Sequence, residues 1–432
     1  MKRDCRSRLD EALAPLDLGR LARESRFQRR QPKKLSPLTF IRSCCLLLAD
    51  QKVSLRRWAI LIGTLINQTY AKQSLFERMT GSAAQFMQSV VLGLVGRLAS
   101  SQQRVLPPAL EGFGRVLIQD STVLTLPAKL RRFFPGARNQ HGGRAGMLRV
   151  QSLYDLKGGN FAFFSHGPFT QTDYNLAGQV VELLRPGDLL LRDLGYLVLA
   201  VLRRIAQRQA FFLCRFKHNL QVHQLDGQPL DLLALLEDRT HPLDKEVLLG
   251  QERLPVRLVA LRVRPEVANR RRQPARRNRR YRPSQKHLRL LSWDLLITNA
   301  SPEQLPTRVV AKVYGLRFHI ETIFKAWKSH FHLEDVPAGS RAQVETLLYA
   351  RLLLITILEV CFLGRWDYEY QDRSGPLSLL KTAAFLQFYV PIALLFQLQS
   401  HLEAALAKQV PYHCAYEKRR KRKNFVEKLQ LT

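Results

Sequence analysis

The segment YGLRFHIETIFKAWK, residues 314–328, places four polar side chains on one stripe of an expected helix. At about 100° per residue, Tyr314, Arg317, Glu321 and Lys328 fall within about 60° of one another. Apolar side chains fill the neighbouring arc, as on a helix that packs against a core. An ordinary surface helix with an Arg317–Glu321 ion pair would show the same pattern. The rest of the chain must therefore decide whether the stripe has a chemical role.

Two aspartates end short apolar segments that are expected to be strands. Asp120 closes RVLIQD, and Asp193 closes LLLRD. In the topology expected here these strands are neighbours, so their carboxylates form an oxygen site suited to Mg²⁺, and Glu321 from the helix would complete positions for two ions. Two such ions can activate the attacking oxygen and stabilise the leaving oxygen at a phosphodiester.

Each acid also has an ordinary structural explanation. Asp120 could simply begin a turn in DST, Asp193 could cap the helix that follows its strand, and Glu321 could belong to a surface ion pair. The occurrence of all three together favours metal-dependent chemistry on a nucleic acid.

The charge balance points to a polyanionic partner. The chain has 432 residues, of which 46% are hydrophobic, so it can form substantial cores and is not a disordered protein. Lys and Arg number 68 against 35 acidic residues, which gives a formal net charge of +33 and a pI of about 10.6. Nucleic acid is the simplest partner for such an excess, and a membrane surface is the competing one.

Hydrophobic periodicity divides the chain into segments of different texture. Residues 1–105 are expected to be helical, and LINQTYAKQSLFERM within them could be a DNA-binding helix-turn-helix or an ordinary helical hairpin. Residues 106–216 follow the order β, β, β, α, β, α, β, including a hairpin around KGG. This order is typical of an α/β layer and matches an RNase H-like core.

The second half of the chain interrupts and then resumes this pattern. Residues 217–300 are expected to form a β-rich insertion, with eight arginines between positions 270 and 282 in an exposed loop that either contacts phosphates or is only solvated. Residues 301–365 return to the core with the helix described first. Residues 366–432 are expected to be helical and to end in the basic tail EKRRKRKNF.

No targeting, membrane or disulfide signal is found. The N-terminus lacks the apolar core of a signal peptide, and the apolar run at 351–364 is too short to span a bilayer and is expected to be a buried helix. The six cysteines show no metal-binding spacing, which favours reduced thiols in the cytosol.

The polar residues resemble the DDE triad and the Y-(2)-R-(3)-E-(6)-K signature of bacterial insertion-sequence transposases. Two residues separate Tyr314 from Arg317, three precede Glu321 and six precede Lys328. With Asp120 and Asp193, the resemblance extends over roughly residues 106–365, and the N-terminal region follows the family less distinctly.

The resemblance implies a fold and an activity. The fold is an RNase H-like catalytic core, a mixed five-stranded sheet with helices, interrupted by a β-rich insertion and flanked by helical terminal regions. The activity is cut-and-paste movement of DNA, in which Asp120, Asp193 and Glu321 hold two Mg²⁺ ions that Mn²⁺ can replace. Arg317 and Lys328 would bind DNA phosphates near the scissile bond, and Tyr314 would contact the same backbone.

The resemblance also implies partners. These are double-stranded DNA, as terminal inverted repeats and as target, and a second copy of the chain on that DNA, with the helices after residue 340 as candidate contacts. The protein would act in the bacterial cytoplasm, at the nucleoid. Trp293, in the last strand of the insertion, matches a tryptophan that stacks on a flipped base in related transposases. A core tryptophan packed in a strand is the alternative.

Other residues and activities were weighed against this interpretation. Asp173 is expected to cap a helix, Asp188 lies at the wrong end of its strand, and Glu334 and Asp335 follow the signature without belonging to it. A structure-specific nuclease on the same core, and a non-catalytic DNA-binding protein derived from a transposase, remain the alternative functions.

Overall fold

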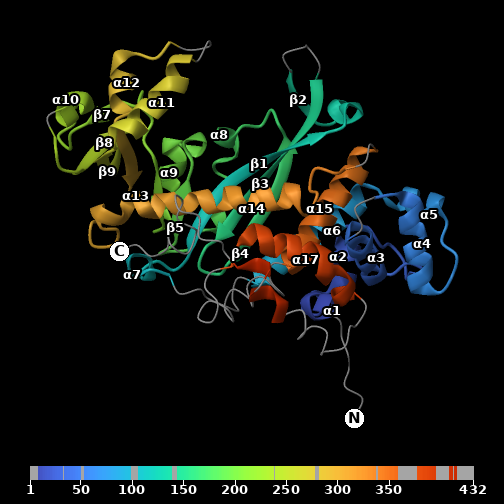
Figure 1. The fold of residues 1–432 in the computed structure, drawn as a ribbon. Helices are drawn as coiled ribbons and strands as arrows, with labels where there is room; N and C mark the ends of the chain where they lie inside the picture. The colour runs from blue at the N-terminus through green and yellow to red at the C-terminus, as the bar shows by residue number, and fades with distance from the viewer. Residues whose placement is uncertain are drawn as a thin grey trace.

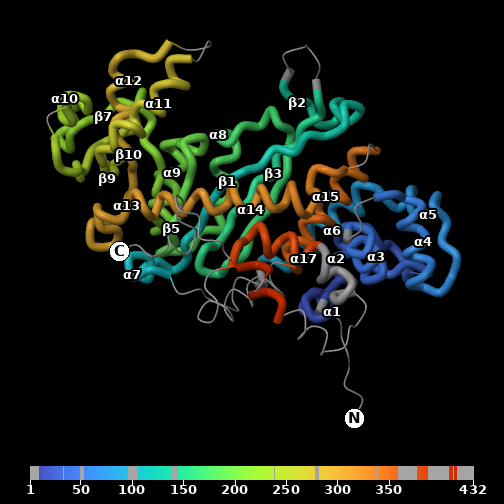
Figure 2. Tube along the Cα trace, viewed as in Figure 1, coloured from blue at the N-terminus to red at the C-terminus, as the bar shows by residue number. Residues whose placement is uncertain are grey.

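The computed structural model describes residues 8–32, 34–49, 53–98, 106–138, 144–237, 239–277, 282–336, 339–358, 377–395, 408–411 and 413–415 (Figure 1). A twisted sheet lies at the centre. The N-terminal helices lie on one side of the molecule, and the segment inserted between Asp193 and Glu321 lies on the other (Figure 2). The basic C-terminal tail predicted from the sequence falls outside the described residues.

The strands form one mixed sheet of ten. Their order is β2-β3-β1-β5-β6-β10-β9-β8-β7, and β4 also pairs with β3. The strands are β1 (Val116–Leu126), β2 (Pro135–Arg138), β3 (Arg144–Asp155), β4 (Asn160–Pro168), β5 (Leu189–Arg192), β6 (Phe211–Arg215), β7 (Val222–His223), β8 (Leu243–Leu249), β9 (Leu254–Arg262) and β10 (Trp293–Thr298).

Five of these strands have the RNase H-like arrangement expected from the sequence. The hairpin β3–β4 and its neighbour β1 are antiparallel, whereas β5 and β6 run parallel to β1. The order β4-β3-β1-β5-β6 is that of the RNase H-like core. The insertion does not form a separate sheet, because β10 pairs with β6 and extends the core sheet through β9, β8 and β7.

The described helices are α1 (Arg8–Leu13), α2 (Leu18–Glu24), α3 (Pro37–Ala49), α4 (Leu55–Ile66), α5 (Lys72–Arg78), α6 (Gly81–Leu98), α7 (Pro108–Glu111), α8 (Asp173–Leu176), α9 (Leu199–Gln207), α10 (Leu232–Glu237), α11 (Pro265–Arg277), α12 (Gln285–Leu290), α13 (Thr307–Gly315), α14 (His319–Ser329), α15 (Arg341–Leu358) and α17 (Leu379–Leu395). The first helix in the order expected for residues 106–216, over TDYNLAGQVVELL at residues 172–184, is shorter than its pattern suggests, since α8 has four residues and a 3-10 turn follows it.

The sheet separates two hydrophobic cores. Side chains alternate between its faces, so Ile118 of β1 and Leu191 of β5 enter one core while Leu117 and Leu190 enter the other. The first core is shared with α13, α14, α15 and the N-terminal helices, and the second with α9 and α10. This alternation decides which face each polar residue of a strand occupies.

The helices from the two ends of the chain pack together. In α15, every residue from Val344 to Leu358 except Glu345 is buried, and the helix packs on α6 and α3. The apolar run at its end is a buried helix as expected, as far as it is described. These side chains are packed within the chain. No helix in the described ranges is long and apolar enough to cross a membrane.

The Arg-rich segment differs from the loop expected from the sequence. Residues Pro265–Arg277 form α11, and residues 278–281 lie outside the described part. Arginine is a good helix former, and two of these arginines anchor the helix to its neighbours. Arg271 pairs with Asp294 of β10 at 2.6 Å, and Arg272 donates to Ser292 Oγ at 2.6 Å.

The described cysteines, Cys44, Cys45, Cys214 and Cys414, are free and buried.

Trp327 is the largest aromatic anchor between α14 and the sheet. It is fully buried and packs on Phe161 and Phe164 of β4. We expect Trp327→Ala to lower the free energy of unfolding by about 3–5 kcal/mol, because it removes buried area and leaves a cavity. Chemical denaturation checks this, with Ile60→Ala as control since Ile60 is 60% exposed. Equal losses in the two variants would contradict the assigned packing.

Candidate active site

The register of β1 and β5 brings the two aspartates together. Gln119 of β1 faces Arg192 of β5, so the next residue on each, Asp120 and Asp193, follows at the end of this pairing. Both continue the alternation of Ile118 and Leu191 and face the side of the sheet that carries α14. Asp120 does not end its strand as expected from the sequence, because β1 continues to Leu126 while pairing with β3.

The third acid comes from the helices laid across this face. The 3-10 turn Leu316–Phe318 joins α13 to α14, and the two helices cross the sheet in line (Figure 1). Glu321 lies in the first turn of α14, whose apolar side chains enter the core beneath. The carboxylates differ in access to solvent: the side chain of Asp120 is 15% exposed, that of Asp193 42% and that of Glu321 55%.

Arg317 joins the three acids. Its guanidinium lies 2.9 Å from Asp120 Oδ2 and 2.9 Å from Glu321 Oε1, and 3.9 Å from Asp193 Oδ1. The residue is only 5% exposed. Tyr314 and Arg317 of the stripe described first therefore face inward, whereas the Glu321 side chain is 55% exposed. The Arg317–Glu321 pair is part of an ion network with Asp120 and Asp193 rather than an isolated surface pair.

Tyr314 supports the same group from the end of α13. Its hydroxyl donates to Asp193 Oδ1 at 3.4 Å, and the residue is 4% exposed. The guanidinium of Arg215 lies 5.5 Å from the centre of its ring. Burial raises the pKa of the Tyr314 hydroxyl, so it remains a proton donor to the carboxylate.

Lys328 lies at the edge of the site. Its ammonium donates to the backbone carbonyl of Val123 in β1 at 2.6 Å and pairs with Glu334 at 3.0 Å, and its side chain is one-third exposed. The sequence analysis set Glu334 aside. The structure shows that Glu334 is the acidic partner of Lys328.

Trp293 lies apart from the acids. It begins β10, is 8% exposed and belongs to the second hydrophobic core. This placement agrees with the alternative of a core tryptophan.

Burial and charge act in opposite directions on Asp120. Burial raises the pKa of its carboxyl to about 6, against the Arg317 guanidinium and the Ser121 N–H, which both favour the ionised form. The pKa of Arg317 is raised although burial opposes its charge, because Tyr314 and the acids beside it favour the cation. The group therefore consists of three acids held around one permanent cation.

This donor set suits a divalent cation. Carboxylate oxygens are the ligands that Mg²⁺ prefers, and a cationic guanidinium already bridges two of the three acids and approaches the third. Within the described ranges, no three metal-binding side chains stand close enough together to hold an ion as they are. Arg317 keeps the carboxylates arranged around its own charge.

A second polar cluster supports the aspartates from the opposite face of the sheet. Asp173, which the sequence analysis interpreted as a helix cap, accepts from Ser121, Arg149 and Gln151. The cap is in fact Thr172. The only sequence signal for this cluster is the position of Ser121 directly after Asp120.

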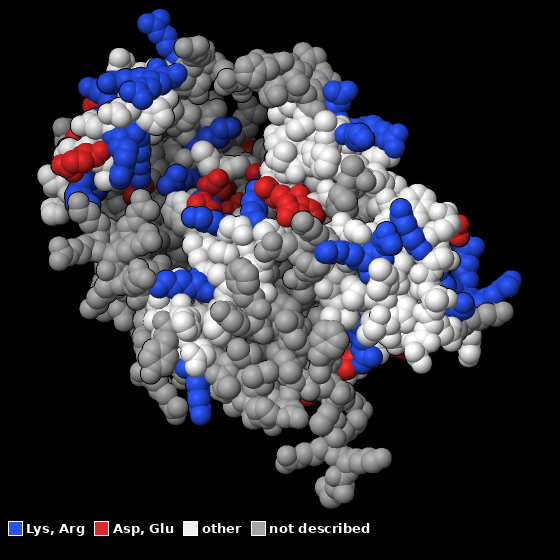
Figure 3. Space-filling view, turned by 45° about the vertical axis from the view of Figure 1, so that its right-hand side comes forward, with Lys and Arg blue, Asp and Glu red and all other residues white. Residues whose placement is uncertain are grey.

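Charged side chains are unevenly spread over the face shown in Figure 3. Acidic side chains gather near its middle, with Lys and Arg on several sides of them. A hollow of about 900 Å³ lies in the N-terminal layer beside α5. Its lining includes one acid, Glu77, and five cationic residues: Arg26, Arg29, Arg30, Lys34 and Arg78.

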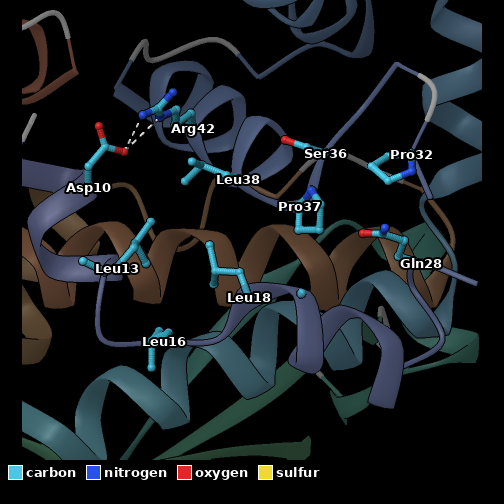
Figure 4. Close-up of a pocket in the computed structure, with 12 residues that line it drawn as sticks. Asp10, Leu13, Leu16, Leu18, Gln28, Pro32, Ser36, Pro37, Leu38 and Arg42 are labelled. Atoms are coloured by element: carbon cyan, nitrogen blue, oxygen red, sulfur yellow. Dashed lines mark hydrogen bonds and ion pairs between the residues drawn. The ribbon is translucent and has the colours of Figure 1, made fainter. Parts of the chain in front are cut away.

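A cavity of about 590 Å³ adjoins this hollow in the N-terminal layer, with Gln28 and Pro32 in both linings (Figure 4). Most of its lining is apolar, and the charged residues in that lining are Asp10 and Arg42, which pair with each other at 2.6 Å. It contains none of the residues predicted to be catalytic.

The raised pKa of Asp120 predicts a pH dependence of stability. The folded chain holds this proton more tightly than the unfolded chain, whose reference value is 3.8, so the contribution is complete below about pH 4 and is lost as pH rises through about 6. We expect Asp120→Asn to remove this loss, which is at most about 1.4 kcal/mol per pH unit. Denaturation in EDTA from pH 4 to 7 measures it, with the exposed Asp226→Asn as control. Parallel profiles for wild type and Asp120→Asn would contradict the shift.

Known proteins share this sequence over most of its length. A family model described as the transposase DDE domain matches residues 111–357. The transposase for insertion sequence element IS231F of Bacillus thuringiensis subsp. israelensis is 25% identical over 408 residues, which cover 88% of this chain and 84% of that protein. That for IS231C of Bacillus thuringiensis subsp. berliner is 27% identical over 89% of this chain and 84% of its own.

A solved structure is similar at a greater distance. The cryo-EM structure of the piggyBac transposase synaptic complex with hairpin DNA aligns with 95% of this chain and 84% of its own, at 10% identity and a TM-score of 0.44. The family match is decisive, since it covers more than half of the chain, including all three acids and the helix that carries Arg317. This protein belongs to the transposase DDE domain family and is an insertion-sequence transposase.

Proposed function

We propose that this transposase cuts DNA at the two ends of its element and joins the freed ends to a target, with Asp120, Asp193 and Glu321 as catalytic acids. The observation that carries the proposal is the convergence of these three carboxylates on the Arg317 guanidinium. They come from a strand, a strand end and a helix that are far apart in the sequence. An isolated surface ion pair on α14 needs no such convergence.

Transposases of this family generally use divalent metal ions. The residues that would hold them are Asp120, Asp193 and Glu321, and we propose Mg²⁺, with Mn²⁺ able to replace it. When bound, two such ions activate the attacking oxygen and stabilise the leaving oxygen of an in-line displacement. Water is the attacking group at the element's end, and the 3′-hydroxyl produced there is the attacking group at the target.

The chain's own residues position the reaction. Tyr314 holds one oxygen of Asp193, and β1 fixes Asp120 against the sheet. Arg317 has a further donor, Nε, which is buried and has no hydrogen-bond partner among the described residues. When another cation neutralises the acids, this guanidinium can bind the phosphate next to the scissile bond through two parallel hydrogen bonds. Lys328, at the exposed edge, is placed to contact the adjacent phosphate.

Binding of DNA follows from membership in this family, and the charges of the chain indicate where the double helix lies. We propose that the basic hollow beside α5 contacts the phosphate backbone of the element's terminal inverted repeat. The turn between α4 and α5 and the five cations of the hollow support a DNA-binding role for residues 1–105.

Two ends must be held together, so we propose a dimer assembled on DNA in the cytoplasm. The helices after residue 340 are its candidate contacts, and the buried side chains of α15, which pack on α3 and α6, are not available for it.

A donor plasmid bounded by the inverted repeats that flank the gene tests this function. In Mg²⁺ we expect the wild type to cut the ends and join them to target DNA, and Glu321→Gln to give no detectable product, because a catalytic carboxylate is lost. Glu182→Gln is the matched control, since Glu182 is 66% exposed and pairs with Arg204 and Arg208 rather than with the Arg317 network. Gel analysis separates cut from joined products.

The outcomes of this assay distinguish the alternatives. Cutting without joining would indicate a nuclease, and binding of the ends without cutting would indicate a non-catalytic DNA-binding protein. Joined products from Glu321→Gln would exclude the proposed role of that residue.

Arg317 predicts how the DNA-free protein binds metal. Its positive charge among the acids opposes a cation, so we expect Arg317→Gln to bind Mn²⁺ at least about tenfold more tightly than wild type, while cutting DNA more slowly. Isothermal titration calorimetry measures the affinity. Arg215→Gln is the control, because Arg215 lies over the ring of Tyr314 and forms none of the ion pairs of the site found in the described residues. Unchanged or weaker Mn²⁺ binding by Arg317→Gln would refute the counter-ion role.

A further inference from the structure

Asp173 carries a carboxylate that its own helix does not use. It is the first residue of α8, a helix of four residues. The side chain of Thr172 caps this helix, and Asn175 completes a reciprocal capping box with it. The carboxylate of Asp173 is therefore available for contacts with the sheet.

Those contacts converge on a single oxygen. Asp173 Oδ1 accepts from Ser121 Oγ at 2.7 Å, from Arg149 Nη1 at 2.9 Å and from Gln151 Nε2 at 3.0 Å. Arg149 Nη1 also donates to Ser121 Oγ at 2.9 Å. The side chain of Asp173 is 26% exposed and that of Arg149 11%, so the ion pair is largely shielded from water.

The first link runs to Asp120. Ser121 directly follows it in β1, and the backbone N–H of Ser121 donates to Asp120 Oδ1 at 2.8 Å. Alternation along β1 directs Asp120 towards α14 and Ser121 towards the opposite face. Asp173 thus holds the strand from behind at the residue next to the catalytic acid.

The second link runs to Asp193. The 3-10 turn Leu194–Tyr196 begins directly after Asp193, and the hydroxyl of Tyr196 donates to Gln151 Oε1 at 2.7 Å. Asp173 also lies against this turn, because a Cβ at Gly195 would stand 3.4 Å from Asp173 Oδ2. One carboxylate therefore contacts the segments that carry both aspartates.

We infer that Asp173 is a positioning residue for DNA cutting, which fixes Asp120 and Asp193 relative to each other from the face of the sheet opposite Arg317. The inference rests on the proposed function of those two acids. The Arg317 network lies on the catalytic face, where a metal ion would compete with Arg317 for the carboxylates. The hydrogen bonds of Asp173 lie on the other face and involve none of those carboxylates. They can therefore hold the segments of Asp120 and Asp193 in place while ligands bind on the catalytic face.

The test compares Asp173→Asn with a matched control. Asp188→Asn breaks another ion pair, to Arg115, at the other end of β5, so it reports the cost of losing a buried carboxylate in the same sheet. Ser121→Ala is a milder second variant, because it removes only the hydroxyl that links Asp173 to the segment of Asp120. Three quantities are measured for each folded variant: the single-turnover rate constant of end cutting, the affinity for the end DNA and the affinity for Mn²⁺ without DNA.

We expect Asp173→Asn to lower the rate constant and the Mn²⁺ affinity by about 10- to 100-fold, with unchanged affinity for the DNA, and Ser121→Ala to act in the same direction to a smaller extent. Asp188→Asn should match wild type in all three quantities once its folded fraction is taken into account. Asp173→Asn and Ser121→Ala with wild-type rates and Mn²⁺ affinity would overturn the inference, as would losses no greater than those of Asp188→Asn. If the wild type itself does not cut, the proposed function fails, and the Mn²⁺ affinities still test the positioning role.

Discussion

The contact between the Arg317 guanidinium and three carboxylates is the constraint on which the site depends. Asp120, Asp193 and Glu321 gather three acidic groups around one guanidinium, and burial raises the pKa of the Asp120 carboxyl. Arg317 supplies that cation permanently and is itself almost fully buried. Burying an unpaired arginine costs free energy. The acids stabilise the buried guanidinium of Arg317, and the guanidinium in turn stabilises their charges.

The fold makes this contact possible through two regular features. Parallel pairing of β1 with β5 places two residues of matching register side by side, and strand alternation directs both carboxylates to one face. The apolar face of α14 then packs on that same side of the sheet and brings Glu321 and Arg317 over the aspartates. Because β10 continues the core sheet into the insertion, this segment can be long without disturbing the register at the site.

The sequence predicted the parts of the site that depend on local spacing. The RNase H-like strand order and the stripe from Tyr314 to Lys328 follow from alternation and helical periodicity, and the topology correctly made β1 and β5 neighbours. The direction of the stripe does not follow, since a helical wheel groups Arg317 with Glu321 whether they face water or the core. Asp173 was misinterpreted because its partners lie on β1 and β3, and only strand pairing brings them together. The arginines of α11 looked like a loop because their partners, Asp294 and Ser292, come from a later segment.

The charge at the site also couples the binding of its ligands. Three carboxylates and one guanidinium leave a local excess of negative charge, whereas the whole chain carries +33. The basic surface can attract DNA, yet a phosphate arriving at the acids meets repulsion that one arginine cannot offset. On the proposed function, a cation held by the acids would lower this repulsion and would free Arg317 for the phosphate, so each ligand would favour the other by the same free energy. We propose that this coupling disfavours cutting before both the cation and the DNA are in place.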